Sequence, residues 1–210
     1  ECGIRIRGNA SRSFPQKSFT LFARKRYGNN TFASVFSDPD ETCPTLILNN
    51  SRTLTKTFFF RLVDDRNTAG QEYRPCQLFL NGEYWGMYYL MEKYSAEYLE
   101  NHYQVPASDI LLIKDREEIQ SGNSEDYTCW QEVLDLFRKD LSDPDNYTAL
   151  LEKVDIQSLI DWLCTNIYIA NTDTRPLGGN VYTWRSIRPT GEDYNDGKWR
   201  WILYDLDDAL

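Results

Sequence analysis

Acidic and amide side chains gather in the last forty residues of the chain, after an apolar helical run. Asp173 closes the polar turn that ends this run, and Asn180 follows a pair of glycines. Asp205 and Asp207 come after the aromatic and β-branched run 199–204. Because side chains two apart on a strand share a face, we expect these two aspartates to point the same way. Carboxylates held this close repel each other unless a cation or a proton lies between them.

The chemistry of these donors favours a hard divalent cation. A set of oxygen ligands suits Mg²⁺. An Asp, an Asn and then a strand-borne Asp is also the order found in protein kinases, where the first is the base and the other two bind metal. The alternative is a hairpin with solvated acids, and Asp173 and Asn180 upstream make that alternative less favoured.

Length and composition allow one domain or two small lobes around a cleft. The chain has 210 residues, of which 41% are hydrophobic and 14% aromatic, so it can bury a core. It holds no apolar run long enough for a membrane-spanning helix. Because it begins without Met and ends just after the acidic cluster, we expect a fragment whose C-terminal part is incomplete.

Charge is distributed unevenly along the chain. The net charge of -9 does not favour a nucleic-acid partner. The first thirty residues are nevertheless basic, and the last twenty are acidic. A basic segment facing an acidic one across a metal is what a nucleoside triphosphate requires, although such asymmetry also occurs without function. The basic residues of the first segment are Arg5, Arg7, Arg12, Lys17, Arg24, Lys25 and Arg26.

Cysteine and histidine usage excludes several kinds of site. The cysteines form no CxxC pair, which argues against structural zinc. Each is predicted to be a small core residue. The single histidine, His102, argues against Ser-His-Asp and Cys-His catalysis and is expected to be structural or exposed. The cysteines are Cys2, Cys43, Cys76, Cys129 and Cys164.

The N-terminal segment predicts two strands around a turn of small polar residues. Alternation at 3–7 and 17–22 is typical of strands, and 8–13 is rich in Gly, Asn and Ser. Backbone N–H groups of this turn and the ammonium of Lys17 are suited to covering a phosphate chain. No nucleotide-binding P-loop consensus is present, so an ordinary hairpin with an exposed lysine is the alternative.

The middle of the chain predicts a hairpin that leads into a helix. Asn81-Gly82 separates two strand patterns at 74–80 and 84–90. The second is apolar almost throughout, which predicts that both of its faces are covered. It runs through Met91 and Glu92 toward a helix at 96–102, as at a crossing between lobes where the backbone meets an adenine edge. Glu92 either contacts nucleotide or begins the helix.

Further strands and helices complete the predicted fold. Strands are expected at 45–48 and 110–114, and a helix at 54–63 with Phe58 to Phe60 in the core. Apolar spacing predicts a helix over 127–141, broken at Asp143-Pro144-Asp145. Asp155 is expected to cap a last helix over 156–169. The side chains predicted on its buried face are Leu159, Ile160, Leu163 and Ile167.

Four segments together resemble the spore coat protein H (CotH) kinase family. They are RIRGNASRSFPQKSFTL, LFLNGEYWGMYYLMEKY, ANTDTRPLGGNVYTWR and KWRWILYDLDDAL, and the resemblance spans essentially all 210 residues. It implies an α+β, divergent two-lobed protein-kinase-like fold. The N-terminal lobe, 1–92, would be mainly antiparallel sheet, and the C-terminal lobe, 93–210, mainly helical.

The resemblance also implies a function. Members of the family bind ATP and a divalent metal, Mg²⁺ or Mn²⁺, and phosphorylate Ser or Thr of an acceptor protein, some at the spore surface. An extracytoplasmic or surface location is therefore implied, with no nucleic-acid partner and no membrane span. The alternatives are a catalytically silent, pseudokinase-like binding or surface-interaction domain, and a hydrolase or carbohydrate-binding domain.

By the same resemblance, the N-terminal side supplies the nucleotide contacts. Lys17 looks like the phosphate-pairing lysine, and its acidic partner would be Glu72 or Glu92. Met91 and Glu92 look like the adenine hinge. The phosphate-covering loop would be formed by Gly8, Asn9, Ser11 and Arg12.

The C-terminal side is implied to supply the chemistry. Asp173 looks like the residue that orients or deprotonates the acceptor hydroxyl. Asn180 and Asp205 look like metal ligands, with Asp207 supporting them. The physical expectation is that the Lys17 amine and the Asp205 carboxylate line a single crevice that binds a polyphosphate.

Overall fold

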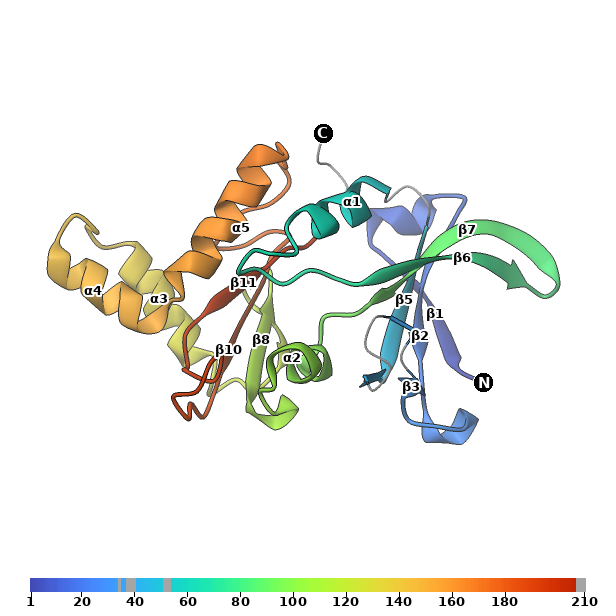
Figure 1. Ribbon diagram of the computed structural model, residues 1–210, viewed down its shortest axis with the longest axis horizontal. Helices are drawn as coiled ribbons and strands as arrows, with labels where there is room; N and C mark the ends of the chain where they lie inside the picture. Colours follow the sequence, from blue (N-terminus) through green and yellow to red (C-terminus); the bar gives the residue numbers. More distant parts are fainter. Residues whose placement is uncertain (34, 37–40, 51–53, 207–210) are drawn as a thin grey trace.

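The computed structural model describes residues 1–33, 35–36, 41–50 and 54–206, and the fold is mixed α+β (Figure 1). The described residues form antiparallel sheets and five α-helices. Five of the strands up to Glu92 form one sheet, on the right of Figure 1, and the strands after Glu92 form another sheet to its left. The predicted combination of antiparallel sheet and helix is confirmed.

The first sheet has five antiparallel strands in the order β1-β2-β5-β7-β6. Arg7 at the end of β1 pairs with Ser18 at the start of β2, so the turn between them closes a hairpin, as predicted. A separate pair, β3 (Phe32–Ala33) with β4 (Thr42–Cys43), lies in the segment between β2 and β5. The strands of the first sheet are β1 (Gly3–Arg7), β2 (Ser18–Phe22), β5 (Thr45–Asn50), β6 (Tyr73–Leu80) and β7 (Glu83–Glu92).

The β6–β7 hairpin turns where the sequence predicts it. Asn81 and Gly82 have φ of 52° and 83°, the left-handed conformation that a two-residue hairpin turn requires at both positions. The prediction that both faces of the second strand are covered is wrong for its first half, where Trp85 and Met87 are 40% and 43% exposed. The hairpin extends beyond the other strands in Figure 1, so no layer covers its tip.

The second sheet has four antiparallel strands in the order β11-β10-β8-β9, and β8 is its centre. Alternate β8 residues enter different cores: Leu111 and Ile113 pack with α3 and α5, and Ile110 and Leu112 pack with α2. This explains the unbroken apolar run of β8, since both faces of the strand are covered. The strands are β8 (Ile110–Lys114), β9 (Glu118–Ser121), β10 (Tyr182–Ser186) and β11 (Arg200–Ile202).

The helices follow the predicted order with changed limits. The helix predicted over 127–141 ends at Phe137. The break predicted at Asp143 is the N-cap of an additional helix, since Asp143 accepts a hydrogen bond from Asp145 N at 2.9 Å and Pro144 takes the first helical position. The helices are α1 (Leu54–Leu62), α2 (Ala96–Tyr103), α3 (Thr128–Phe137), α4 (Pro144–Lys153) and α5 (Ile156–Tyr168).

The buried face of α5 differs from the predicted one. Ile160 and Ile167 are 44% and 75% exposed, although both were predicted to be buried. Leu159 is buried as predicted, and the helix also buries Trp162 together with polar residues that bond to neighbouring backbone. Apolar spacing alone therefore predicted a buried helix face that is rotated relative to the face observed in the structure. In α1, similarly, Phe59 and Phe60 are in the core as predicted, whereas Phe58 is exposed.

The cysteines are not core residues, contrary to prediction. Cys2 and Cys164 are exposed, the other three are half-buried, and all five are free thiols. Burial is the main cause that raises the pKa of Cys43 to about 11, so this thiol is protonated at neutral pH. Among the described residues, no helix has both the length and the apolar character needed to cross a membrane.

Candidate active site

The predicted catalytic residues lie in the segments that follow α5 and β11, and these two elements start side by side. The residues before α5 pair in parallel with the start of β11: Asp155 N donates to Trp199 O at 3.0 Å, and Trp199 N donates to Lys153 O at 2.9 Å. Further along, Trp162 Nε1 donates to Ile202 O at 3.2 Å. The segments that follow α5 and β11 therefore emerge at the same end of this pair.

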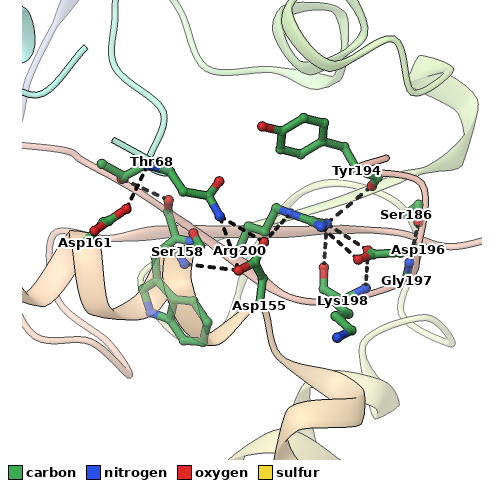
Figure 2. A network of polar contacts seen from close by, with 12 residues as sticks. Thr68, Asp155, Ser158, Asp161, Ser186, Tyr194, Asp196, Gly197, Lys198 and Arg200 are labelled. Atoms are coloured by element: carbon green, nitrogen blue, oxygen red, sulfur yellow. Dashed lines mark hydrogen bonds and ion pairs between the residues drawn. The ribbon is translucent and has the colours of Figure 1, made fainter. Parts of the chain in front are cut away.

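Arg200 joins the starts of the two elements in a buried ionic network (Figure 2). Its guanidinium donates to Asp155 Oδ2 at 3.0 Å and to Asp196 Oδ2 at 2.8 Å, and the residue is 6% exposed. Asp155 also caps α5 by accepting from Ser158 N at 3.1 Å, as predicted. Burial opposes ionisation of Asp196, but the Arg200 and Lys198 donors outweigh it and lower the pKa of this carboxyl.

The C-terminus of α5 ends in a Schellman motif. Ala170 has φ of 52°, Asn171 N donates to Asn166 O at 2.9 Å, and Ala170 N donates to Ile167 O at 3.1 Å. The motif turns the chain sharply and buries Asn171. The Asn171 amide donates to Asn166 Oδ1 at 3.0 Å and to Asp205 O at 3.4 Å. Asn171 thus connects the end of α5 to the segment after β11.

The same turn brings Asp173 and Asn180 together. Asn171 Oδ1 accepts from Asp173 N at 3.2 Å, and Asn180 Nδ2 donates to Asp173 Oδ2 at 2.7 Å. Gly178, Gly179 and Asn180 all have positive φ, which folds the chain back toward Asp173. Since the Asn180 amide nitrogen is used and no described residue donates to its oxygen, that oxygen is available as a ligand.

The sequence predicted Asp205 on a strand, but this residue lies outside the strands. β11 ends at Ile202, and Asp205 has φ of 54°, the left-handed region that few non-glycine residues adopt. Leu203 and Leu206, on either side of Asp205, are fully buried. The spacing argument for a shared face with Asp207 therefore does not apply, and Asp207 lies outside the described residues.

The first sheet reaches this region through Arg7. Arg7 Nη2, at the end of β1, donates to the hydroxyl of Tyr204 at 3.3 Å, and Tyr204 immediately precedes Asp205. The start of the Gly8 turn therefore lies near the segment after β11. Gly8 has φ of 108°, and a Cβ there would come within 1.9 Å of Ser11 Oγ, so the turn requires glycine.

Lys17 lies at the base of the same turn. Its ammonium donates to Arg12 O at 2.7 Å, and its carbonyl accepts from the Tyr88 hydroxyl at 2.8 Å. Asn9 O accepts from Arg12 N at 3.2 Å, which tightens the turn. Within the described residues, no hydrogen bond or ion pair joins Lys17 to Asp205, Glu72 or Glu92, so their expected association stays a prediction.

Met91 and Glu92 connect the first sheet to α2. Met91 is 1% exposed. The Glu92 carboxylate accepts from Glu72 N at 2.7 Å and contacts His102 Nε2 at 2.8 Å, so the half-buried histidine has a structural role. Glu92 does not begin the helix, because α2 starts at Ala96 after the N-cap Ser95.

The acids around His102 favour its protonated form. Burial opposes its charge, but the hydrogen bond to Glu92 and the nearby charges of Glu92, Glu41 and Glu72 outweigh this and raise the pKa of the imidazole. Ligand atoms of Glu41, Glu92 and His102 lie within 4.8 Å of one another, close enough for a cation. The Glu92–His102 bond already satisfies this group without one.

A cavity of about 450 Å³ lies away from Asp173. It is lined by the linker between α1 and β6, by one face of α2 and by Tyr194. Of the residues predicted for the nucleotide and metal site, Glu72 lines it, as a candidate partner of Lys17, but the predicted phosphate, adenine and metal contacts do not. The predicted site is therefore defined by side-chain contacts and not by this cavity.

The oxygen donors on this side of the molecule fit a hard divalent cation. Asp173, Asn180 and Asp205 offer carboxylate and amide oxygens, and hydrogen bonds join Asp173 to Asn180 and, through Asn171, to the main-chain oxygen of Asp205. Mg²⁺ and Mn²⁺ prefer such oxygen donors.

Sequence reasoning missed two residues of this region. Arg200 was given no role within the run 199–204, although a charged residue between Trp199 and Trp201 suggests a buried ion pair. Lys56 was not noticed either, although it lies two residues before three successive phenylalanines in a predicted core helix. In both cases the signal is a cation placed among aromatic residues.

Comparison with known proteins gives a family. No match was found among curated proteins. The model of the family described as CotH kinase protein matches residues 4–210, which is nearly the whole chain. The chain therefore belongs to the CotH kinase protein family.

Proposed function

We propose that this protein is an ATP- and divalent-metal-dependent protein kinase that transfers the γ-phosphoryl group to Ser or Thr of an acceptor protein. Membership of the CotH kinase family supports kinase activity in general. The observation that carries the proposal is the Asp173–Asn180 hydrogen bond of 2.7 Å, joined to Asp205 through Asn171. An acid in contact with an amide, with a second acid on the neighbouring segment, supplies the groups that phosphoryl transfer requires.

Asp173 is assigned to the acceptor hydroxyl. It is exposed, so an acceptor can reach it, and its carboxylate is oriented by Asn180. One carboxylate oxygen accepts from Asn180, which leaves the other free to take the hydroxyl proton. Positioning contributes most in such a reaction, because little covalent chemistry is asked of the protein.

Asn180 and Asp205, with Asp207 supporting them, are assigned as the metal ligands. The bound cation would neutralise the charge of the β- and γ-phosphates. The Asn180 amide nitrogen is held by Asp173, and its oxygen is thereby directed away from that acid. The left-handed conformation of Asp205 is strained for a non-glycine residue, as is frequent at functional sites.

The Gly8 turn and Lys17 are assigned to the phosphate chain, and the β7–α2 junction to the adenine. Backbone N–H groups of Asn9 to Arg12 would donate to phosphate oxygens. The Lys17 ammonium would exchange the Arg12 carbonyl for phosphate. At Glu92 the backbone N–H already donates to Glu72 O at 3.2 Å, so the adenine contacts would come from the residues just after it.

The same proposal divides the chain into an N-terminal lobe, 1–92, and a C-terminal lobe, 93–210. The boundary falls between the two sheets, at the end of β7. An extracytoplasmic or surface location goes with the family's known members and is part of this proposal.

The test is phosphate transfer from γ-labelled ATP with Mg²⁺ or Mn²⁺, scored on the protein itself and on a generic Ser/Thr-rich acceptor protein. We expect labelled phosphoserine or phosphothreonine from the wild type and none from D205N. Equal labelling by D205N would overturn the proposed metal ligand. Stabilisation by ATP without any transfer by the wild type would instead favour the silent, pseudokinase-like binding domain.

A further inference from the structure

Lys56 is a buried cation on α1. The residue is 4% exposed, and it shares α1 with the core residues Phe59 and Phe60. Among the described residues it has no hydrogen-bond or ion-pair partner. Its ammonium instead lies 5.4 Å from the centre of the Tyr204 ring.

An ammonium in this position is unfavourable for folding alone. Burying a charge without an anion loses hydration that nothing replaces. Contact with an aromatic face recovers only a small part of that loss. A buried and unpaired lysine is therefore expected where a ligand supplies the missing anion.

Two other cations approach the same tyrosine, and they differ from Lys56. Arg7 donates to the Tyr204 hydroxyl at 3.3 Å. Lys114 lies 5.9 Å from the ring centre, and its ammonium is paired with Asp115 at 3.2 Å and with Glu118 at 3.5 Å. Lys114 is thus neutralised within the protein, whereas Lys56 has no acidic partner in the part of the chain that the structure describes.

The position of Tyr204 indicates which anion Lys56 would meet. Tyr204 immediately precedes Asp205, the proposed metal ligand, and Arg7 leads into the Gly8 turn proposed to cover phosphates. Lys56 therefore lies against the segment between the phosphate-covering turn and the metal ligands. A polyphosphate that bridges these two elements would pass close to its ammonium.

We propose that Lys56 is a phosphate-binding residue, which contributes a second ammonium from α1 in addition to Lys17. This inference rests on the proposed function, because it takes the nucleoside triphosphate as the ligand. It also means that α1 must pack against the second sheet, because otherwise the phosphate site lacks the Lys56 ammonium. Nucleotide affinity then depends on the position of this helix.

The test compares K56M and K56R with the matched control K114M, which removes the neighbouring but paired ammonium. ATP with Mg²⁺, adenosine and inorganic tripolyphosphate are titrated calorimetrically, and melting temperature is measured without ligand. We expect K56M to weaken ATP and tripolyphosphate binding by about tenfold or more, with adenosine binding unchanged. K56R should keep most of the affinity, and K114M should change it by less than about threefold.

A structural lysine would give a different pattern. Removal of an unpaired buried charge should leave the melting temperature of K56M unchanged or raised, so a K56M that melts lower or does not fold would overturn the proposal. Unchanged ATP affinity in a folded K56M would also overturn it.

The design separates this inference from the proposed function. If tripolyphosphate binding depends on Lys56 but no phosphate is transferred from ATP, the phosphate site is supported and the proposed kinase activity is overturned. A wild type that binds neither ATP nor tripolyphosphate would overturn both.

Discussion

The two ends of the α5–β11 pair carry polar clusters of opposite design. At the start of the pair, the Arg200 cation is buried between two acids, and each of its partners has further donors. At the far end, Asp173 is exposed, its partner is the neutral Asn180, and no described cation pairs with it. Both acids of the first cluster, here called the balanced end, are thus paired with a cation, whereas the acid of the second cluster, the unbalanced end, is paired with none among the described residues.

This difference separates a structural cluster from a functional one. The buried charges of the balanced end hold elements together, because the guanidinium and both carboxylates make their hydrogen bonds within the protein. Excess acid and left-handed backbone at Ala170, Asn180 and Asp205 oppose folding locally. Such features persist where the surrounding frame holds them, and here the frame is the α5–β11 pair.

The largest effect is expected at the unbalanced end. D173N should lower kcat for phosphate transfer by about 10²–10⁴-fold, because the amide cannot accept the hydroxyl proton. ATP affinity should stay within about threefold, since Asp173 is assigned to the acceptor. Single-turnover transfer and ATP titration measure the two effects, with D145N on exposed α4 as the control. If D173N lost ATP binding as well as phosphate transfer, the assignment of Asp173 to the acceptor and not to the metal would be wrong.

The balanced end should respond in stability. R200M leaves the Asp155 and Asp196 carboxylates without their shared cation, which is expected to lower the free energy of unfolding by about 3–5 kcal/mol. Denaturant unfolding measures it. The control is R138M, which breaks the exposed Arg138–Asp135 pair and should change stability by less than about 1 kcal/mol. Similar small losses for both variants would mean that the Arg200 network does not hold the frame.

A third charged group, Glu92 with His102, should make stability depend on pH. The pKa of His102 is raised in the folded protein, so its stabilisation is complete below the ordinary value of about 6.5. That stabilisation is lost as the pH rises through the higher folded-state pKa. Melting temperature measured from acidic to alkaline pH should therefore fall more steeply in the wild type than in H102Q. Parallel curves would show that the Glu92–His102 bond does not titrate with folding.

The smallest effect is expected at the junction between frame and turn. Ala170 has a left-handed φ that glycine adopts more readily, so A170G should stabilise the protein by about 0.5–1 kcal/mol. The control A149G lies inside α4, where the same replacement should destabilise by about 0.5–1 kcal/mol. Chemical denaturation resolves both. Destabilisation by A170G would indicate that the Ala170 methyl group packs against the turn.

Local patterns in the sequence were sufficient for much of the fold. The alternation at β1 and β2, the Asn81-Gly82 turn and the Asp155 cap depend on neighbours in the chain, and each was predicted correctly. The buried face of α5 was not, because polar residues such as Ser158 and Asn166 are buried there by bonds to distant backbone or within the helix. Apolar spacing carries no information about such partners.

The candidate site was also predicted only in part from the sequence. The residue types and order of Asp173, Asn180 and Asp205 were read from the sequence, and so was the family they resemble. That Asn171 links the turn to Asp205, and that Arg7 and Lys56 approach Tyr204, could not be read, because these contacts join segments far apart in the chain.

The sequence by itself determined which side chains are available and where the chain turns, since both depend on short-range chemistry. Only the tertiary structure decided which charges are neutralised. Arg200, Lys114 and Lys56 are alike as basic residues in the sequence, yet the first two have carboxylate partners and Lys56 has none among the described residues. Charge pairing depends on distance in space and on burial, and packing of the helices and sheets sets both.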